Sequence, residues 1–78
     1  MREKRLRLVV AFPNTTSAMA MEKHCRISGV EGRLIAVPPV ITAGCGMAWC
    51  AELKEETAIK EILRREGIET EGIYQILL

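Results

Sequence analysis

The sequence predicts an α/β (α+β) fold, a four-stranded antiparallel sheet with two helices on one face. Two observations predict it. Apolar, strand-like runs and amphipathic segments follow one another in the order βαβ and then βαβ again. Residues 29–35 and 67–74 also repeat one pattern, a glycine, a β-branched residue, a glutamate and a new strand. Right-handed crossovers in two such halves give the ferredoxin-like plait. A small α/β sheet with a different strand order is the alternative.

The chain begins with one strand and one helix. Residues 6–12 form an apolar run that ends at Pro13, which is typical of a strand buried on much of both faces. Residues 14–17 offer side-chain oxygens that can cap a helix N-terminus. Gly29 is placed to end that helix in a left-handed conformation. The inward face of the helix is expected to carry Ala18, Met21 and Cys25.

The rest of the chain supplies three strands and a helix. A strand over 33–37 stops at Pro38 and Pro39, a loop covers 40–46, and a short strand covers 47–51. A helix over 53–66 ends at Gly67, and 72–77 forms the last strand. Its inward residues are expected to be Ala58, Ile59, Ile62 and Leu63, and its surface ion pairs Glu56–Lys60 and Glu61–Arg65.

Composition restricts the class of protein. With 78 residues, of which 49% are apolar, residues 1–78 are expected to form a single folded domain. Eleven basic and ten acidic residues give a net charge of +1, which argues against nucleic-acid binding driven by bulk charge. Three aromatic residues are too few for the exposed stacking surface of an RNA-binding plait.

The cysteines and the uncharged stretch indicate a reduced, cytoplasmic protein without a membrane span. Three cysteines form no even disulfide framework, and the apolar run at 8–12 is too short for a signal peptide. Residues 34–51 carry no charge, but two adjacent prolines and two glycines exclude a continuous spanning helix. No C-x₂-C pair occurs, so no metal site and no cofactor are predicted.

The strongest chemical signal is Cys45, which lies between Gly44 and Gly46. Glycines allow a reacting group to approach closely, and they permit turns whose N–H groups converge on one point. Such N–H groups would favour a thiolate or a persulfide sulfur. The alternative is a tight bend with a small buried residue, and the sequence leaves both interpretations open.

The other thiols are expected to be structural. In an extended strand Cys50 faces the same side as Ala48, and roughly 16 Å of chain separates it from Cys45. A core position is favoured over a resolving thiol. Cys25 lies on the inward helix face as a small hydrophobic residue, and His24 beside it is expected at the surface.

The sequence resembles the selenium/sulfur carrier-like family of small bacterial proteins over nearly its whole length. The resemblance rests on the first strand ending in Phe12, the helix start Thr15–Ala18, Glu22-Lys23, Val37-Pro38, Ile41-Thr42, the pair Cys45-Gly46 and the closing Gly-Ile turns. Pro39 stands where the family often has a basic residue, and Cys50 is additional.

The resemblance implies a carrier that holds a persulfide or selenopersulfide on Cys45 and passes it from a protein donor to a protein acceptor. Gly44 and Gly46 would give access, and Thr42 with backbone N–H groups would polarise the sulfur. Such a chain is not an enzyme with a small-molecule substrate of its own.

Two rival interpretations remain. One is a non-catalytic interaction or regulatory module in which Cys45 is a turn residue. Its apolar end, Ile76 to Leu78, would form an edge that pairs with a second copy as a homodimer. The other is a metal site between subunits.

Overall fold

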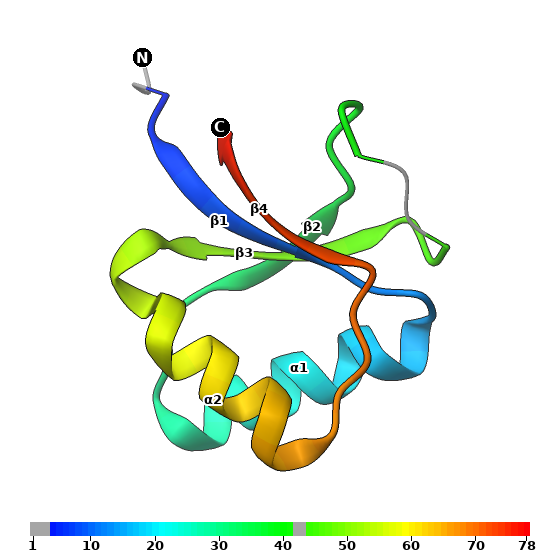
Figure 1. Cartoon of the computed structure of the whole chain (residues 1–78), viewed down its shortest axis with the longest axis vertical. Helices are drawn as coiled ribbons and strands as arrows, with labels where there is room; N and C mark the ends of the chain where they lie inside the picture. The colour runs from blue at the N-terminus through cyan, green and yellow to red at the C-terminus, as the bar shows by residue number, and fades with distance from the viewer. Residues whose placement is uncertain (1–3, 42–43) are drawn as a thin grey trace.

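The computed structural model describes residues 4–41 and 44–78, which form one antiparallel sheet with two helices below it (Figure 1). The strand order is β2-β3-β1-β4, so β1 and β3 are central and β2 and β4 are edges. The arrangement confirms the predicted βαββαβ ferredoxin-like fold. The elements are β1 (Leu6–Ala11), α1 (Thr15–Ser28), β2 (Arg33–Ala36), β3 (Met47–Glu52), the 3₁₀ turn η1 (Leu53–Glu55), α2 (Glu56–Glu66) and β4 (Gly72–Leu77).

The predicted boundaries are wrong by one residue at three strand ends and by one turn at the second helix. β1 ends at Ala11, β2 at Ala36 and β3 at Glu52. Leu53 to Glu55, predicted as the first turn of a regular helix, forms a 3₁₀ turn instead. The residues at the N-cap positions of η1 and α2 provide no side-chain hydrogen bond to the backbone. Helix ends without such a cap commonly form the tighter 3₁₀ hydrogen bonds, which give their backbone groups partners.

Both helices end as predicted, and α1 also begins as predicted. The Asn14 side chain accepts a hydrogen bond from the Ser17 N–H at 2.8 Å. Gly29 and Gly67 adopt left-handed φ angles of 71° and 63°, and the N–H groups that follow bond back to the last helical turn. These caps fix where the chain leaves each helix and returns to the sheet.

The main core fills the space between the sheet and the helices. It includes Ala18, Met21 and Cys25 from α1 and Ile59, Ile62 and Leu63 from α2, as predicted, whereas Ala58 is only half-buried. The two central strands contribute alternate residues, Leu8, Val10, Trp49 and Ala51, and Phe12 directly after β1 continues the alternation. This is the larger of the two clusters.

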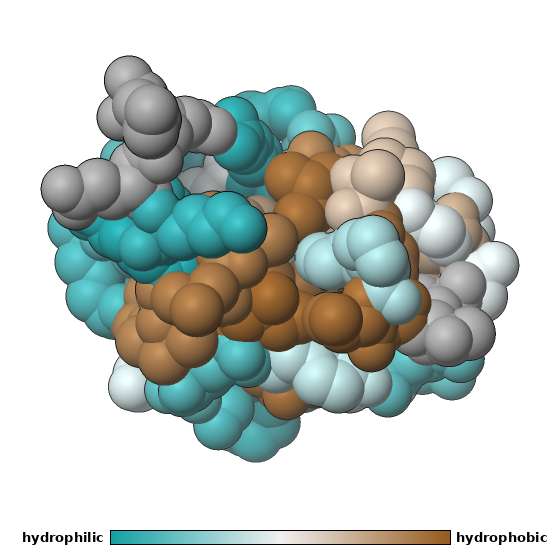
Figure 2. Space-filling model, turned by 90° about the horizontal axis from the view of Figure 1, so that it is seen from above, coloured by the Kyte–Doolittle hydropathy of each residue, from teal (hydrophilic) through white to brown (hydrophobic). Residues whose placement is uncertain are grey.

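A second apolar cluster covers the opposite face of the sheet. Val9, Ala11 and Ala48 lie fully buried there under Ile41, with Ile35, Val37 and Ile76 packed around them. Seen from the side opposite the helices, this face shows an apolar band bordered by hydrophilic residues (Figure 2). Ile41 is itself 7% exposed and belongs to this cluster.

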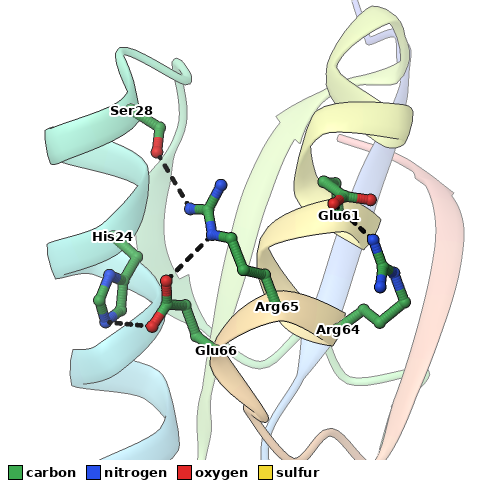
Figure 3. A network of polar contacts seen from close by, with 6 residues as sticks. All are labelled: His24, Ser28, Glu61, Arg64, Arg65 and Glu66. Carbon is green, nitrogen blue, oxygen red and sulfur yellow. Dashed lines mark hydrogen bonds and ion pairs between the residues drawn. The ribbon is translucent and has the colours of Figure 1, made fainter.

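A polar network ties the two helices together at the surface (Figure 3). Arg65 Nε donates to Glu66 at 3.0 Å, and a terminal Arg65 nitrogen lies 3.5 Å from Ser28 Oγ on α1. His24 Nε2 lies 3.6 Å from the other oxygen of Glu66. The predicted Glu61–Arg65 pair is therefore wrong: Arg65 turns to Ser28 and Glu66, and Glu61 pairs with Arg64. The predicted Glu56–Lys60 pair is confirmed at 3.0 Å.

Within residues 4–41 and 44–78, neither helix is both long enough and apolar enough to cross a bilayer.

Candidate functional site

The segment Gly44-Cys45-Gly46, here called the thiol loop, immediately precedes β3. At its far end the Val37 N–H donates to the Gly46 carbonyl at 3.0 Å, which extends the β2–β3 ladder by one pair. The thiol loop is therefore held at the base of the β2–β3 connection. Thr42, the fourth predicted site residue, lies outside the described residues.

Gly44 is fixed by two contacts from distant parts of the chain. Its N–H donates to Glu71 Oε1 at 2.6 Å, across a sequence separation of 27 residues. A Cβ atom at this position would lie 2.5 Å from the Pro13 carbonyl oxygen, closer than real side chains approach backbone. Glycine is therefore required here by the close approach of Pro13.

The sulfur of Cys45 interacts with its own backbone. The side chain is half-buried and packs against the main core. The Met47 N–H donates to Sγ at 3.4 Å, and the thiol donates to the Met47 carbonyl at 3.5 Å. The thiol of Cys45 thus uses both its weak acceptor and its weak donor capacity on the backbone of Met47.

The thiol loop lies at the N-terminal end of α1. Gly44 contacts Pro13, which immediately precedes the cap residue Asn14. Figure 1 shows the green loop beside the start of the cyan helix. The first turn of α1 contains no acidic residue, and the carboxylate that reaches this corner is that of Glu71, bonded to the Gly44 N–H.

Gly46 leaves one side of the loop open. Its φ is +73°, a left-handed conformation that glycine adopts at no steric cost, and a Cβ placed there would meet no atom within 4 Å. The predicted left-handed turn therefore occurs at Gly46, where the space beside its Cα is open. The Gly44 N–H, in contrast, points to Glu71 and away from the sulfur.

The three cysteines occupy separate places and are all free. Cys45 is half-buried on the helix side of the sheet, whereas Cys25 is fully buried in the main core. Cys50 is 8% exposed and follows Ala48 on the opposite face, as the strand alternation predicts. Because the sheet separates Cys50 from Cys45, Cys50 is not placed to resolve a disulfide with it.

Burial raises the pKa of Cys25 to about 11, and the carboxylate of Glu55 adds to the rise. A thiol in the unfolded chain ionises near its ordinary value of about 8.5. The native state thus keeps a proton that the unfolded state loses, so the free energy of unfolding should decrease as the pH rises from about 8.5 toward 11. We expect a loss of about 2 kcal/mol from this group.

Urea unfolding at about pH 8 and about pH 10.5 measures this effect. The matched variant is Cys25→Ala, which is less stable throughout but lacks this titrating group. Its stability should therefore decline less between the two pH values. An equal decline in both proteins would contradict the assignment.

Two pockets lie at the opposite end of β3. One, of 240 Å³, is lined by Cys50 together with Arg7 and Arg33, and the other, of 340 Å³, is lined by Trp49. Trp49 Nε1 is buried and has no hydrogen-bond partner within the described residues. Neither pocket includes Cys45. Among residues 4–41 and 44–78, no group of histidine, cysteine and acidic side chains is arranged to hold a metal ion.

Three partners of the thiol loop are not evident from the sequence pattern. Glu71 and Pro13 contact Gly44 only because β4 and the β1–α1 connection meet at this corner of the sheet. Met47 contributes backbone atoms, which no side-chain motif reveals. The available signal was Gly44 itself, since a glycine permits a close backbone approach.

Comparison with known proteins gives one match. A family profile described as "Putative Se/S carrier protein-like" matches residues 7–75, which include every strand and helix except the end positions of β1 and β4. No curated protein and no solved structure matches this chain. The match extends over most of the sequence and includes the thiol loop. The chain therefore belongs to the Se/S carrier protein-like family.

Proposed function

We propose that this protein is a sulfur or selenium carrier whose acceptor atom is Cys45 Sγ. The observation that carries the proposal is the position of this sulfur: it is the least buried of the three thiols and accepts a backbone N–H bond from Met47. The family membership supports a carrier function. The thiol loop also lies beside the start of α1, whose first turn carries no acidic side chain.

The transfer chemistry is thiol–persulfide exchange. The Cys45 thiolate attacks the outer sulfur of a donor protein's persulfide, so a bond forms between Sγ and that sulfur while the donor's inner S–S bond breaks. The donor thiolate leaves with the electron pair, and no net oxidation occurs. An acceptor nucleophile then attacks the same outer atom, and Cys45 leaves as a thiolate. Selenium follows the same steps as a selenopersulfide.

The residues in and next to the thiol loop have distinct roles in this scheme. The Met47 N–H bonds Sγ in the free and loaded states, because a persulfide retains lone pairs on that atom. Gly46 leaves the open side from which a donor approaches. Gly44, held by Glu71, keeps the loop against the helix end. Thr42 is proposed from the sequence as a further polarising group.

The test is sulfur loading by a cysteine desulfurase with cysteine, followed by intact mass spectrometry under non-reducing conditions. We expect the wild-type protein to gain the mass of one sulfur atom and Cys45→Ser to gain none. Cys50→Ala and Cys25→Ala serve as matched controls that retain loading. Additions that persist in Cys45→Ser would refute the site.

The second candidate is an interaction module in which Cys45 is a turn residue. The packing of Cys45 on the main core and its bond to the Met47 carbonyl favour this function. Alkylation kinetics discriminate between the two. A carrier thiol should react faster in the native protein than in denaturant, whereas a structural turn should react more slowly. A carrier with a free thiol also requires a reducing compartment, so we propose that the protein is cytoplasmic.

A further inference from the structure

We propose that two copies of this chain pair through the free edge of β4 to form a twofold-symmetric dimer with one continuous sheet. The proposal does not depend on the carrier function. β4 is an edge strand of six residues, Gly-Ile-Tyr-Gln-Ile-Leu, with neither charge nor proline. Edge strands are ordinarily protected by such residues, and an unprotected edge is a template for pairing.

The register of the β1–β4 ladder identifies the backbone groups at this edge. Arg5 and Leu78 exchange both of their N–H···O bonds, at 3.1 and 3.0 Å, and form a hydrogen-bonded pair. Such pairs alternate along an antiparallel ladder, so Ile76 and Tyr74 also direct their backbone groups toward β1. The N–H and C=O groups of Ile73, Gln75 and Leu77 therefore point outward along the edge.

The outward backbone groups of one β4 edge are complementary to those of the same edge in a second copy. In an antiparallel pairing centred on Gln75, this residue lies opposite Gln75 of the second copy, and Ile73 lies opposite Leu77 of the second copy. Every outward N–H and C=O of the three residues then belongs to a hydrogen-bonded pair. No shift of register is needed to use all of them.

The side chains match in the same register. Tyr74 pairs with Val9 and shares its face, and Ile76 packs against the same cluster, so both lie on the face opposite the helices. In the dimer, Tyr74 of each copy lies opposite Ile76 of the other copy. Ile73 and Leu77, 37% and 60% exposed, meet in the same way on the helix side. Apolar cross-strand pairs of this kind stabilise antiparallel sheets.

The other edge does not offer an equivalent surface. β2 has only four residues and begins with Arg33. Because Val37 bonds Gly46 across the ladder, alternation leaves only Leu34 and Ala36 with outward backbone groups. Pro38 then prevents the strand from extending. A second copy is thus better accommodated at β4 than at β2.

The dimer leaves the thiol loop accessible. In the strand order β2-β3-β1-β4, β1 and β4 separate β3 from the second copy. The pairing uses the backbone groups of Ile73, Gln75 and Leu77, whereas the thiol loop contacts Glu71, which precedes β4 and lies outside the paired residues. Loading of Cys45 is therefore expected to proceed in monomer and dimer alike, and a failure of either hypothesis leaves the other testable.

The experiment uses sedimentation equilibrium with charge-swapped variants at the symmetry axis. The wild-type chain should approach twice its 8.7 kDa mass as its concentration rises to about 1 mM. Gln75→Lys and Gln75→Glu each place like charges opposite one another, so each alone should remain monomeric. An equimolar mixture of the two should form the dimer again. Thr57→Lys, at an exposed position on α2, is the matched control and should dimerise as the wild type does.

Amide hydrogen exchange tests the register independently. Protection of the Ile73, Gln75 and Leu77 N–H groups should increase with protein concentration. A wild-type chain that stays monomeric up to the highest concentration would overturn the proposal. So would a dimer that both single-charge variants leave intact, or one whose concentration-dependent protection falls on β2.

Discussion

Replacing Phe12 by alanine is expected to lower the free energy of unfolding by about 3–5 kcal/mol, a large share of what a chain of this size has. Phe12 is fully buried and is the largest of the completely enclosed side chains. It follows the last residue of β1 and belongs to the main core, which also contains Ala18 and Met21 of α1. Truncation removes the ring from this core and leaves a cavity that two short helices cannot fill.

Urea or thermal unfolding measures the effect, with two matched variants. Phe12→Leu keeps most of the volume and should cost less than half as much. Ile27→Ala changes an apolar residue that is 70% exposed and should be close to neutral. A loss of less than about 1 kcal/mol for Phe12→Ala would show that this part of the core is loosely packed.

Gly44→Ala is expected to destabilise the protein by about 2–3 kcal/mol and to impair sulfur loading of Cys45. The new methyl group would lie 2.5 Å from the Pro13 carbonyl oxygen, and both groups belong to backbone that cannot move aside cheaply. The loop must shift, and the Gly44 N–H then loses its charged partner Glu71. Hydrogen bonds to charged groups are the stronger class, so this loss adds to the steric cost.

The matched control is Gly46→Ala, on the other side of the thiol. Here an added methyl group meets no atom, but the residue would adopt a φ of +73°. Its cost should be about 1 kcal/mol, from backbone conformation alone. Equal effects of the two substitutions on stability and loading would contradict the close packing of Gly44 on Pro13. Glu71→Gln, which keeps an acceptor oxygen, should lie between the wild type and Gly44→Ala.

Patterns of neighbouring residues were sufficient to predict the helices and strands of this fold. The Asn14 cap, the left-handed ends at Gly29 and Gly67 and the inward face of α1 follow from residue types at fixed spacings, and the structure confirms them. The predicted first turn at Leu53 was wrong because the chain has no capping side chain there. The Glu61–Arg65 pair was wrong because Ser28, on the other helix, offers Arg65 a competing partner.

By itself, the sequence determined the order of strands and helices, the residues that face the main core and the single thiol bracketed by glycines. These depend on interactions over a few residues, which the pattern records directly. Only the tertiary structure decided that Gly44 packs closely against Pro13 and hydrogen-bonds Glu71, and that the three thiols lie apart. Those contacts join segments far apart in the chain, and their geometry exists only once the sheet has formed.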